Sequence, residues 1–464
     1  MATPSGLSAV EHVVVLMLEN RSLDHMLGYL YSDADNTSPA GDPFEGLTGT
    51  ESCPGSDGSA VSVFRLAPDT PDVYFYPGAD PGEGYAATND QCYGSTAAPT
   101  DGASAPMTGF VTNYAQAITD NRSNGWYVFD GTDESWIMGC HTPDTLPVLS
   151  ALARGFSVCD HWYGSAPTMT MPNRAFLCAG TSQGHMDDKT KKFTVGSIFG
   201  ALTTKNVSWR IYGYDASPLT KSDFPDTSSA PAANFGHFAD FQTDAKNGDL
   251  PAFAFVEPAW SSDGNSQHPN YNMALGEQLI LDTYRAVKDG PDWASTLLIV
   301  TYDEHGGCYD HVSPPWGATP PDDSTGEYGF DFTRFGPRVP TILVSPLVPA
   351  GTVHRVPDGN TPFDHTSVLA TIEHRFGIDP LTKRDAAAPD VGAALSLSQA
   401  RTDDPLAGVA APTPPTNPTN LTVQPSHLQE VQAALIADET GIQPEALAPL
   451  RTNEDYKRFI AEHG

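Results

Sequence analysis

The feature that most constrains the fold of this chain is a set of short, apolar runs spread along its length. The first, Val13–Leu18, contains no polar side chain and is half valine. A run of this kind is typical of a strand that is buried on both faces of a parallel sheet. We expect four further strands in similar runs, at 207–212, 252–256, 296–302 and 339–344.

Segments with a helical pattern lie between these runs, at 146–153, 272–287 and 365–376. Strands that alternate with helices predict an α/β fold, in which helices cover both faces of a mostly parallel central sheet. The 464 residues suffice for one large domain of this class or for two to three smaller ones.

Two segments depart from the alternation. Residues 32–131 are rich in Gly, Pro, Asp, Ser and Thr, which predicts a long insertion that serves as a lid or substrate wall or is disordered. Residues 411–418 form a proline-rich linker, and we expect helices at 426–437 and 453–462 after it. The predicted organisation is a catalytic domain at 1–400, which includes the insertion, and a C-terminal helical extension at 401–464.

The balance of charge narrows the range of partners. The 57 Asp and Glu against 24 Lys and Arg give a formal net charge of −33, which argues against nucleic acid and anionic membranes as partners. A small anionic substrate stays possible, because local charges or a metal ion override the global field. The sequence shows no transmembrane segment and no signal peptide, which leaves a cytoplasmic protein or a secreted one with its signal removed. Oligomeric state is left open.

The six cysteines form no Cys-x-x-Cys pair. Buried or free thiols are the favoured interpretation, and the alternative is a disulfide, with Cys53 and Cys92 as the best pair.

Polar residues follow the first predicted strand directly, in Glu19-Asn20-Arg21-Ser22. The carboxyl ends of parallel strands are where open α/β sheets place their ligands. Glu19 and Asn20 offer hard oxygen donors that suit a divalent cation. The alternative is ordinary helix capping by Asn20 or Ser22.

A second polar motif follows the strand at 296–302, in Asp303-Glu304-His305-Gly306-Gly307, with Asp310 and His311 close behind. Adjacent carboxylates repel each other unless a cation or hydrogen-bond donors compensate. Two strand ends that each give two oxygen ligands predict one metal site with four ligands: Glu19, Asn20, Asp303 and Glu304. A polar turn is the alternative.

A third motif runs from Ser165 to Arg174 and contains Thr168, Thr170 and Asn173. A hydroxyl before a helix N-terminus faces free backbone N–H groups, which favours a phosphate beside it. Arg174 is a possible bidentate phosphate contact, whereas the threonines and Asn173 are equally plausible as helix caps.

Three histidines are further candidates for the site: His185, His268 and His365. A structural role is the default for a lone histidine, and only His268, in a loop before the predicted helix at 272–287, departs from it. Gly-rich phosphate loops, HExxH, GxSxG and dinucleotide fingerprints are all missing from the sequence.

Taken jointly, the motifs resemble those of the phosphoesterase family of non-specific phospholipases C and AcpA-type acid phosphatases. The matching stretches occur in the family's order between about residues 10 and 385: Val14–Gly28, Thr142–Ser150, Thr170–Arg174, Asn265–Pro269, Tyr302–Gly307, Tyr309–Val312, Arg338–Thr341 and Phe363–Ser367.

The resemblance implies an alkaline-phosphatase-like α/β fold and a transiently phosphorylated hydroxyl nucleophile, which is Thr170 by motif match. It implies one divalent metal ion held by Glu19, Asn20, Asp303 and Glu304. Ca²⁺, Mg²⁺, Mn²⁺ and Zn²⁺ are all left open, and the oxygen-rich shell favours the first three. His268 would contact the phosphate or protonate the leaving group.

The remaining site residues follow from the same motifs. Asn173 and Arg174 are predicted beside the nucleophile, and His185 and His305 on the substrate side. One departure concerns Asp80-Pro81-Gly82-Glu83, where family members commonly carry histidine at the last position. Glu83 is then a carboxylic acid of raised pKa, a metal ligand, or turned away.

The function expected from this resemblance is hydrolysis of a phospholipid of the phosphatidylcholine type or of a small phosphoester, with phospholipase C favoured over acid phosphatase. A non-catalytic cation-binding surface protein is the alternative of another class. A sulfatase is disfavoured because no cysteine lies in a Cys-x-Pro-x-Arg pattern.

Overall fold

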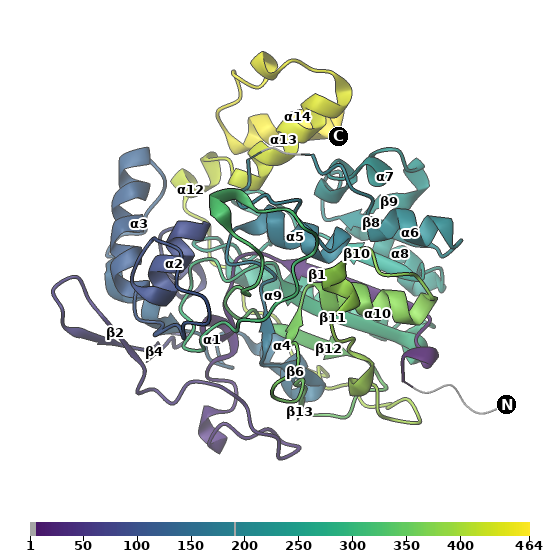
Figure 1. Cartoon of the computed structure of the whole chain (residues 1–464), viewed down its shortest axis with the longest axis horizontal. Helices are drawn as coiled ribbons and strands as arrows, with labels where there is room; N and C mark the ends of the chain where they lie inside the picture. Colours follow the sequence, from purple (N-terminus) through teal and green to yellow (C-terminus); the bar gives the residue numbers. More distant parts are fainter. Residues whose placement is uncertain (1–5, 190–191) are drawn as a thin grey trace.

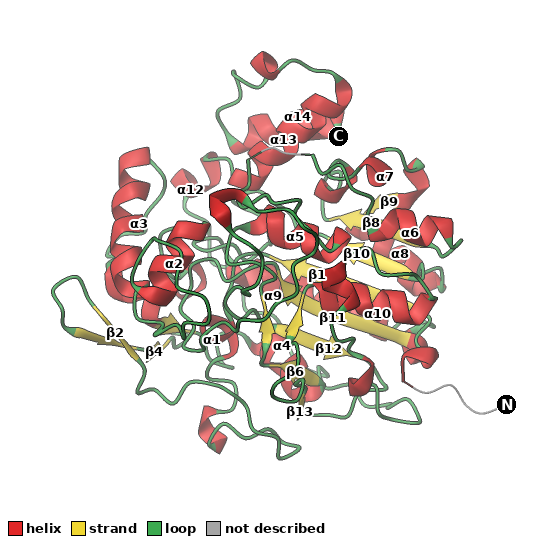
Figure 2. Ribbon diagram, in the orientation of Figure 1, coloured by secondary structure: helices red, strands yellow, loops and turns green. Residues whose placement is uncertain are grey.

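The computed structural model describes residues 6–189 and 192–464. Its centre is an eight-stranded sheet in the order β13-β6-β12-β11-β1-β10-β8-β9 (Figure 2). The strands are, in chain order, β1 (His12–Leu18), β6 (Ser157–Cys159), β8 (Trp209–Gly213), β9 (Phe235–His237), β10 (Phe253–Val256), β11 (Thr296–Tyr302), β12 (Thr341–Val344) and β13 (Thr352–Val353). The predicted mixed α/β fold with a mostly parallel sheet is confirmed.

Only β12 runs against its neighbours, since it pairs antiparallel with both β11 and β6. The central strands β1 and β11 pair in parallel over their whole length, from His12 opposite Thr296 to Leu18 opposite Tyr302. Every residue of β11 is buried, as is every residue of β1 after His12. All five strands predicted from apolar runs are present, whereas β6, β9 and β13 were not predicted.

Helices cover both faces of the sheet (Figure 1). In one group α9 contacts both α4 and α8, and in a second group α5 contacts both α6 and α10. Their bounds, with those of the short helices, are α1 (Leu23–Leu27), α4 (Pro147–Gly155), α5 (Thr170–Ala179), α6 (Ile198–Thr204), α7 (Pro225–Ser228), α8 (Phe238–Asn247), α9 (Met273–Lys288), α10 (Thr366–Phe376) and α11 (Lys383–Ala386). The three helices predicted between strands correspond to α4, α9 and α10.

The insertion between α1 and α4 is ordered rather than structureless. It contains α2 (Tyr85–Tyr93), α3 (Phe110–Asn124) and the small pairs β2 (Ser52–Pro54) with β3 (Ala60–Ser62) and β4 (Phe64–Arg65) with β5 (Gly139–Cys140). A last pair joins β7 (Trp162–Tyr163) to β14 (Phe363–Asp364). The insertion has an apolar cluster of its own, and Cys53 and Cys92 both belong to it. All six cysteines are buried free thiols, so the alternative disulfide is not formed.

The C-terminal extension folds as α12 (Thr419–Val423), α13 (His427–Thr440) and α14 (Asn453–His463), close to the two predicted helices. Ser426 caps α13 and Thr452 caps α14, each by accepting a backbone N–H of the first turn. In Figure 1 the extension lies above α5 and beside the insertion. Within the residues that the structure describes, no helix has both the length and the apolar character that crossing a bilayer requires.

Candidate active site

The ends of β1 and β11 bring the two acidic motifs together. Because Leu18 and Tyr302 are paired, the residues that follow them lie side by side. The backbone N–H of Asn20 donates to Oδ1 of Asp303 at 2.8 Å, across 283 residues of sequence. Glu19, Asn20, Asp303 and Glu304, which we name the strand-end cluster, are all buried. The structure therefore brings the four predicted metal ligands to one place.

Two glycines make this close approach possible. Gly306 and Gly307 have φ angles of +62° and +64°, which side chains rarely adopt. A Cβ on Gly306 would lie 2.0 Å from the carbonyl oxygen of Asn20, and one on Gly307 would lie 2.4 Å from that of Gly82. Only glycine at both positions lets the loop after β11 pack directly on the first motif and on the segment that carries Glu83.

Thr170 lies at the first turn of α5, facing the strand-end cluster. Its hydroxyl donates a hydrogen bond to Oδ1 of Asn20 at 2.9 Å. Asn173, one turn later, holds the preceding loop: its side chain accepts from the N–H of Ala166 and donates to the carbonyls of Thr168 and Met169. Asn173 thus fixes the loop that presents Thr170.

Arg174 is committed to protein partners rather than to the cavity. Its Nε donates to Oδ2 of Asp303 at 3.0 Å, and its Nη2 donates to the carbonyl of Leu18 at 2.9 Å. Its guanidinium lies 4.4 Å from the ring centroid of Trp260. Nη1 is buried without a hydrogen-bond partner. The arginine therefore orients Asp303 and closes the end of β1.

The N-terminus of α5 differs from the expectation of a free phosphate site. The first N–H after Thr170, that of Met171, donates to Oδ1 of Asp188 at 2.8 Å. The other carboxylate oxygen of Asp188 is buried without a hydrogen-bond partner. Burial raises the pKa of Asp188 to about 6. A protein carboxylate thus occupies a position that sequence reasoning assigned to the phosphate.

A cavity of about 670 Å³ opens above Thr170. Glu19, Glu83 and His268 also line it. The amide of Asn20 donates to Glu83, so the glutamate that departs from the family pattern faces the strand-end cluster instead of turning away. Nδ1 of His268 lies 2.9 Å from the carbonyl oxygen of Pro269, and Nε2 lies 3.8 Å from Oδ1 of Asp80.

The other two predicted substrate-side histidines do not line this cavity. His185 lies 3.7 Å from Glu327 and against the ring of Phe193. His305 is buried, with Nε2 2.8 Å from the side-chain oxygen of Gln91 and Nδ1 3.1 Å from Glu304. Burial lowers the pKa of His305 to about 3, so the ring is neutral. In this structure His305 lies beside Glu304 and makes no hydrogen bond to it.

The strand-end cluster is electrostatically incomplete by itself. Oε2 of Glu19 and Oε1 of Glu304 are buried without hydrogen-bond partners. Burial raises the pKa of Glu19 to about 7, and burial together with the Asp303 carboxylate raises that of Glu304 well above its ordinary range. Burial also raises the pKa of Glu83 well above its ordinary range, and repulsion from the Glu304 carboxylate adds to this shift. Unpaired carboxylate oxygens beside the amide oxygen of Asn20 fit a hard divalent cation.

Two tighter groups of potential ligands also lie in the described part of the chain. Asp80, Glu83 and His268 form one beside the strand-end cluster. Asp24, Asp310 and His311 form the other, with Arg338 at its centre, and we call these four residues the arginine-centred network. Asp310, which the sequence placed near the metal site, belongs to this network instead, because Arg338 binds it at 3.0 Å.

Sequence reasoning missed three contributors to the cavity. Asp80 and Asp188 sit in loops without a preceding apolar strand, so no local pattern marks them. The third is the C-terminal extension, which provides His427 and Arg451 among other lining residues. The Asp-Pro-Gly stretch before Glu83 was the available signal for Asp80.

An arrangement of this kind suits attack by a hydroxyl on a phosphorus atom, and comparison with known proteins agrees: the protein is a hydrolase that acts on phosphoester bonds. More narrowly, the chain belongs to the Phosphoesterase family, whose sequence profile matches residues 10–379. This finding sets aside the alternative of a non-catalytic cation-binding protein.

Relatives at this level are named phospholipases C. Non-specific phospholipase C3 of Arabidopsis thaliana is 33% identical over 429 residues, which cover 87% of this chain and 76% of that protein. Non-specific phospholipase C1 of the same plant is 35% identical over 81% of this chain and 69% of its own length. Phospholipase C A of Mycobacterium tuberculosis is 29% identical over 81% and 74%.

Likeness to solved structures is more distant. The phosphonate monoester hydrolase of Agrobacterium radiobacter shares 15% identity and a TM-score of 0.33 over 54% of this chain and 72% of its own. A protein of the alkaline phosphatase superfamily from Vibrio parahaemolyticus shares 12% identity and a TM-score of 0.31 over 52% and 64%.

Proposed function

We propose that the protein is a metal-dependent phospholipase C that hydrolyses phospholipids of the phosphatidylcholine type through a phospho-threonine formed at Thr170. The observation that carries the proposal is the position of the Thr170 hydroxyl, which lies on the floor of the cavity and is hydrogen-bonded to Asn20 of the strand-end cluster. The names of the relatives, phospholipases C from a plant and a bacterium, support the choice of substrate.

Glu19, Asn20, Asp303 and Glu304 would hold the metal ion. A divalent cation bound there supplies Lewis acidity, which stabilises negative charge on oxygen and lowers the pKa of a nearby hydroxyl. The chain's own residues do the rest of the positioning. Arg174 holds Asp303, His305 lies beside Glu304, and Asn173 fixes the loop before the nucleophile.

In the proposed reaction, the Thr170 hydroxyl releases its proton to solvent, its oxygen bonds to phosphorus, and the bond from phosphorus to the diacylglycerol oxygen breaks; in the second step one hydrogen of the attacking water restores the hydroxyl. His268 lies in the cavity with Nε2 directed at Asp80, and when protonated it is placed to give its proton to the departing alcohol. Water then cleaves the phospho-threonine and releases the phosphorylated headgroup, so the enzyme returns to its starting state.

The decisive experiment compares Thr170→Val with Thr170→Ser, which differ in the presence of a hydroxyl at the same place. We expect Thr170→Val to lose at least about a thousandfold in kcat on phosphatidylcholine, since removal of a nucleophile abolishes the covalent route. Thr170→Ser should retain measurable turnover. Acid quenching and peptide mass spectrometry should find a phosphoryl group on residue 170 in the wild type.

Full activity of Thr170→Val, or a phosphoryl group on another residue, would overturn the assignment. Parallel assays with p-nitrophenyl phosphate and p-nitrophenylphosphorylcholine separate acid phosphatase from phosphodiesterase activity. Faster turnover of the monoester would favour the acid phosphatase. Elemental analysis of the purified protein identifies the ion, and chelation followed by restoration with Ca²⁺, Mg²⁺ or Mn²⁺ tests the dependence.

A further inference from the structure

The cavity above Thr170 is lined by two parts of the chain, the catalytic part and the C-terminal extension. The floor carries Glu19, Thr170 and Glu83 from the catalytic part. Nine of the 25 lining residues belong to the C-terminal extension, among them Leu421, His427, Arg451 and Tyr456. The extension lies outside the match to the family profile, which ends at residue 379. The C-terminal extension, which the family profile does not cover, therefore lines part of the cavity above the Thr170 hydroxyl.

The extension is attached by specific polar contacts. Gln424 joins it to the insertion, because its side chain accepts from the N–H of Tyr127 and donates to the carbonyl of Gly125. Asp263, in the loop after β10, accepts from Lys457 and Asn453 at 2.8 Å each. These contacts fix the wall relative to both the insertion and the sheet.

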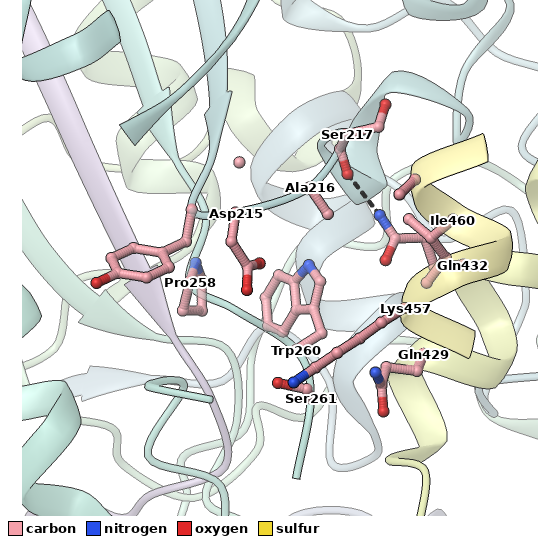
Figure 3. A pocket seen from close by; sticks show the side chains of 13 residues that line it. Asp215, Ala216, Ser217, Pro258, Trp260, Ser261, Gln429, Gln432, Lys457 and Ile460 are labelled. Atoms are coloured by element: carbon pink, nitrogen blue, oxygen red, sulfur yellow. Dashed lines mark hydrogen bonds between the residues drawn. The ribbon is translucent and has the colours of Figure 1, made fainter. Parts of the chain in front are cut away.

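Figure 3 shows the seam between the extension and the strand ends. A small cavity of about 200 Å³ lies there, between α13 and α14 on one side and the loops after β8 and β10 on the other. The side chain of Gln432 crosses the seam and donates to the carbonyl of Ser217 (Figure 3). Trp260 lines this seam, and its ring also covers Arg174 of the active site.

Two further contacts connect the extension to groups around Thr170. Ser426, the N-cap of α13, donates its hydroxyl hydrogen to the carbonyl of Trp260. The next residue, His427, places Nε2 3.8 Å from Oδ2 of Asp188, whose other oxygen accepts the N–H that follows Thr170. The side chain of Asp188 thus lies between His427 at the N-terminus of α13 and Met171 at the N-terminus of α5.

The charge of the cavity gives Arg451 a special position. Five carboxylates line the cavity: Glu19, Asp80, Glu83, Asp188 and Glu430. Arg451 is the only lysine or arginine among the lining residues of the described chain. It is exposed, and its guanidinium donates only to the neighbouring carbonyl of Leu450. Four of its five N–H groups are therefore available to oxygen atoms of a bound molecule.

The size of the cavity indicates which part of a substrate reaches this wall. A volume of about 670 Å³ is typical of sites for drug-sized ligands and exceeds what a small phosphomonoester fills. Leu421, Leu450 and Tyr456 add apolar surface beside Arg451. Apolar side chains around one oxygen-binding cation suit an acylglycerol group with ester carbonyls.

We propose that the C-terminal extension is the substrate-binding wall of the active site, in which Arg451 binds carbonyl oxygens of the acylglycerol part and His427 positions Asp188 beside Thr170. The proposal rests on the proposed function, because it takes Thr170 as the place where phosphorus reacts. The acylglycerol part of the substrate then lies between α14 and the floor of the cavity.

The first test is Arg451→Gln with Arg458→Gln as its matched control, since Arg458 lies on the same extension, is exposed and does not line the cavity. Arg451→Gln should raise KM for phosphatidylcholine in mixed micelles about three- to tenfold with kcat nearly unchanged, and leave kcat/KM for p-nitrophenyl phosphate within about twofold. Arg458→Gln should match the wild type on both substrates. Equal effects on both substrates, or none from Arg451→Gln, would overturn the wall assignment.

The second test is His427→Gln against His463→Gln, another histidine of the extension that lies outside the cavity lining. His427→Gln should lower kcat several-fold on both substrates with KM unchanged. The reason is that His427 acts through Asp188 on the N-terminus of α5, which carries Thr170, and does not bind the acylglycerol part. Identical kinetics of the two variants would contradict a positioning role. If Thr170→Val stays active while Arg451→Gln still raises KM, the nucleophile assignment fails and the wall stands.

Discussion

Two buried groups of carboxylates lie after strands β1 and β11, and they differ in how their negative charge is balanced. The arginine-centred network contains its own cation: Arg338 binds Asp24 at 2.9 Å and Asp310 at 3.0 Å, and it is fully buried. The strand-end cluster has Arg174 on Asp303 and leaves oxygen atoms of Glu19 and Glu304 unpaired.

The pKa values record this difference. Burial by itself would raise the pKa of Asp24, but Arg338 and His311 bring it below its ordinary value. For Glu19 burial prevails, and its pKa rises to about 7. The pairing of a buried carboxylate offsets the cost of its burial, whereas a carboxylate left unpaired is costly unless a ligand completes it. The arginine-centred network is therefore complete within the protein, whereas the strand-end cluster still has carboxylate oxygens without a partner.

The largest expected effect comes from removing the cation of the network. Arg338→Met leaves Asp24 and Asp310 buried without a partner, so we expect a loss of about 3–5 kcal/mol in the free energy of unfolding, measured by urea titration. Arg458→Met, at an exposed position, should change little.

The triple variant Asp24→Asn, Asp310→Asn, Arg338→Met removes the charges on both sides and should recover much of that loss. It also covers the case in which Arg338→Met alone does not fold. Arg338→Met with wild-type stability would show that the network does not hold the loops after β1 and β11 together.

The second prediction concerns pH in the metal-free protein. Because the folded pKa of Glu19 is about 7 and its ordinary value is 4.5, the folded state binds the proton more tightly than the unfolded state. Its contribution is therefore present below about pH 4.5 and is lost as the pH rises through 7. The difference corresponds to about 3 kcal/mol.

Urea unfolding between pH 5 and 8 in the presence of a chelator measures this loss, and Glu19→Gln is the control. Glu277, whose burial raises its pKa to about 8, contributes with the same sign in both proteins and cancels in the difference. A divalent cation at pH 8 should restore stability to the wild type by binding the folded state. Parallel pH profiles of wild type and Glu19→Gln would refute the assignment.

The residues whose location could be predicted from the sequence come directly after a strand. Glu19 and Asp303 come directly after the apolar strands β1 and β11, so their meeting at one sheet edge was predictable. Strands β6, β9 and β13 have only two or three residues, too few to show any period. The reversed direction of β12 is set by the path of its connection, which no local pattern encodes.

Residues that depend on long-range packing were not predictable. Asp188 reaches the N–H of Met171 from a loop, and Asp310 turns to Arg338 rather than to the site. Arg174 was expected to bind phosphate, but the burial of Asp303 gives it a carboxylate partner within the protein. The sequence predicted the helices of the extension but not that the extension lines the cavity. A helical pattern shows which face is apolar, but not which part of the protein packs against that face.

A smaller effect is expected at the edge of the network, where His311 contacts Asp24 and keeps a fifth of its side chain exposed. Burial opposes protonation, but Asp24 raises the pKa of His311 above its ordinary value. Its contribution is therefore present below about pH 6.5 and is lost as the pH rises through the raised value. His311→Gln should lose about 1 kcal/mol at pH 6 and less at pH 9 by urea unfolding. A loss that grows with pH would contradict this sign.

The smallest effect comes from acids that belong to neither group. Most of the 57 acidic residues lie outside both clusters and contribute to the net charge of −33, so the surface field repels an approaching anion. Salt screens this field over about 10 Å at 0.1 M. We expect added NaCl to raise kcat/KM for dianionic p-nitrophenyl phosphate by about twofold and to leave that for zwitterionic phosphatidylcholine almost unchanged. Because the strand-end cluster is buried, its own charges are screened much less, so the response isolates the surface. Equal salt responses of the two substrates would show that the surface acids do not select among phosphoesters.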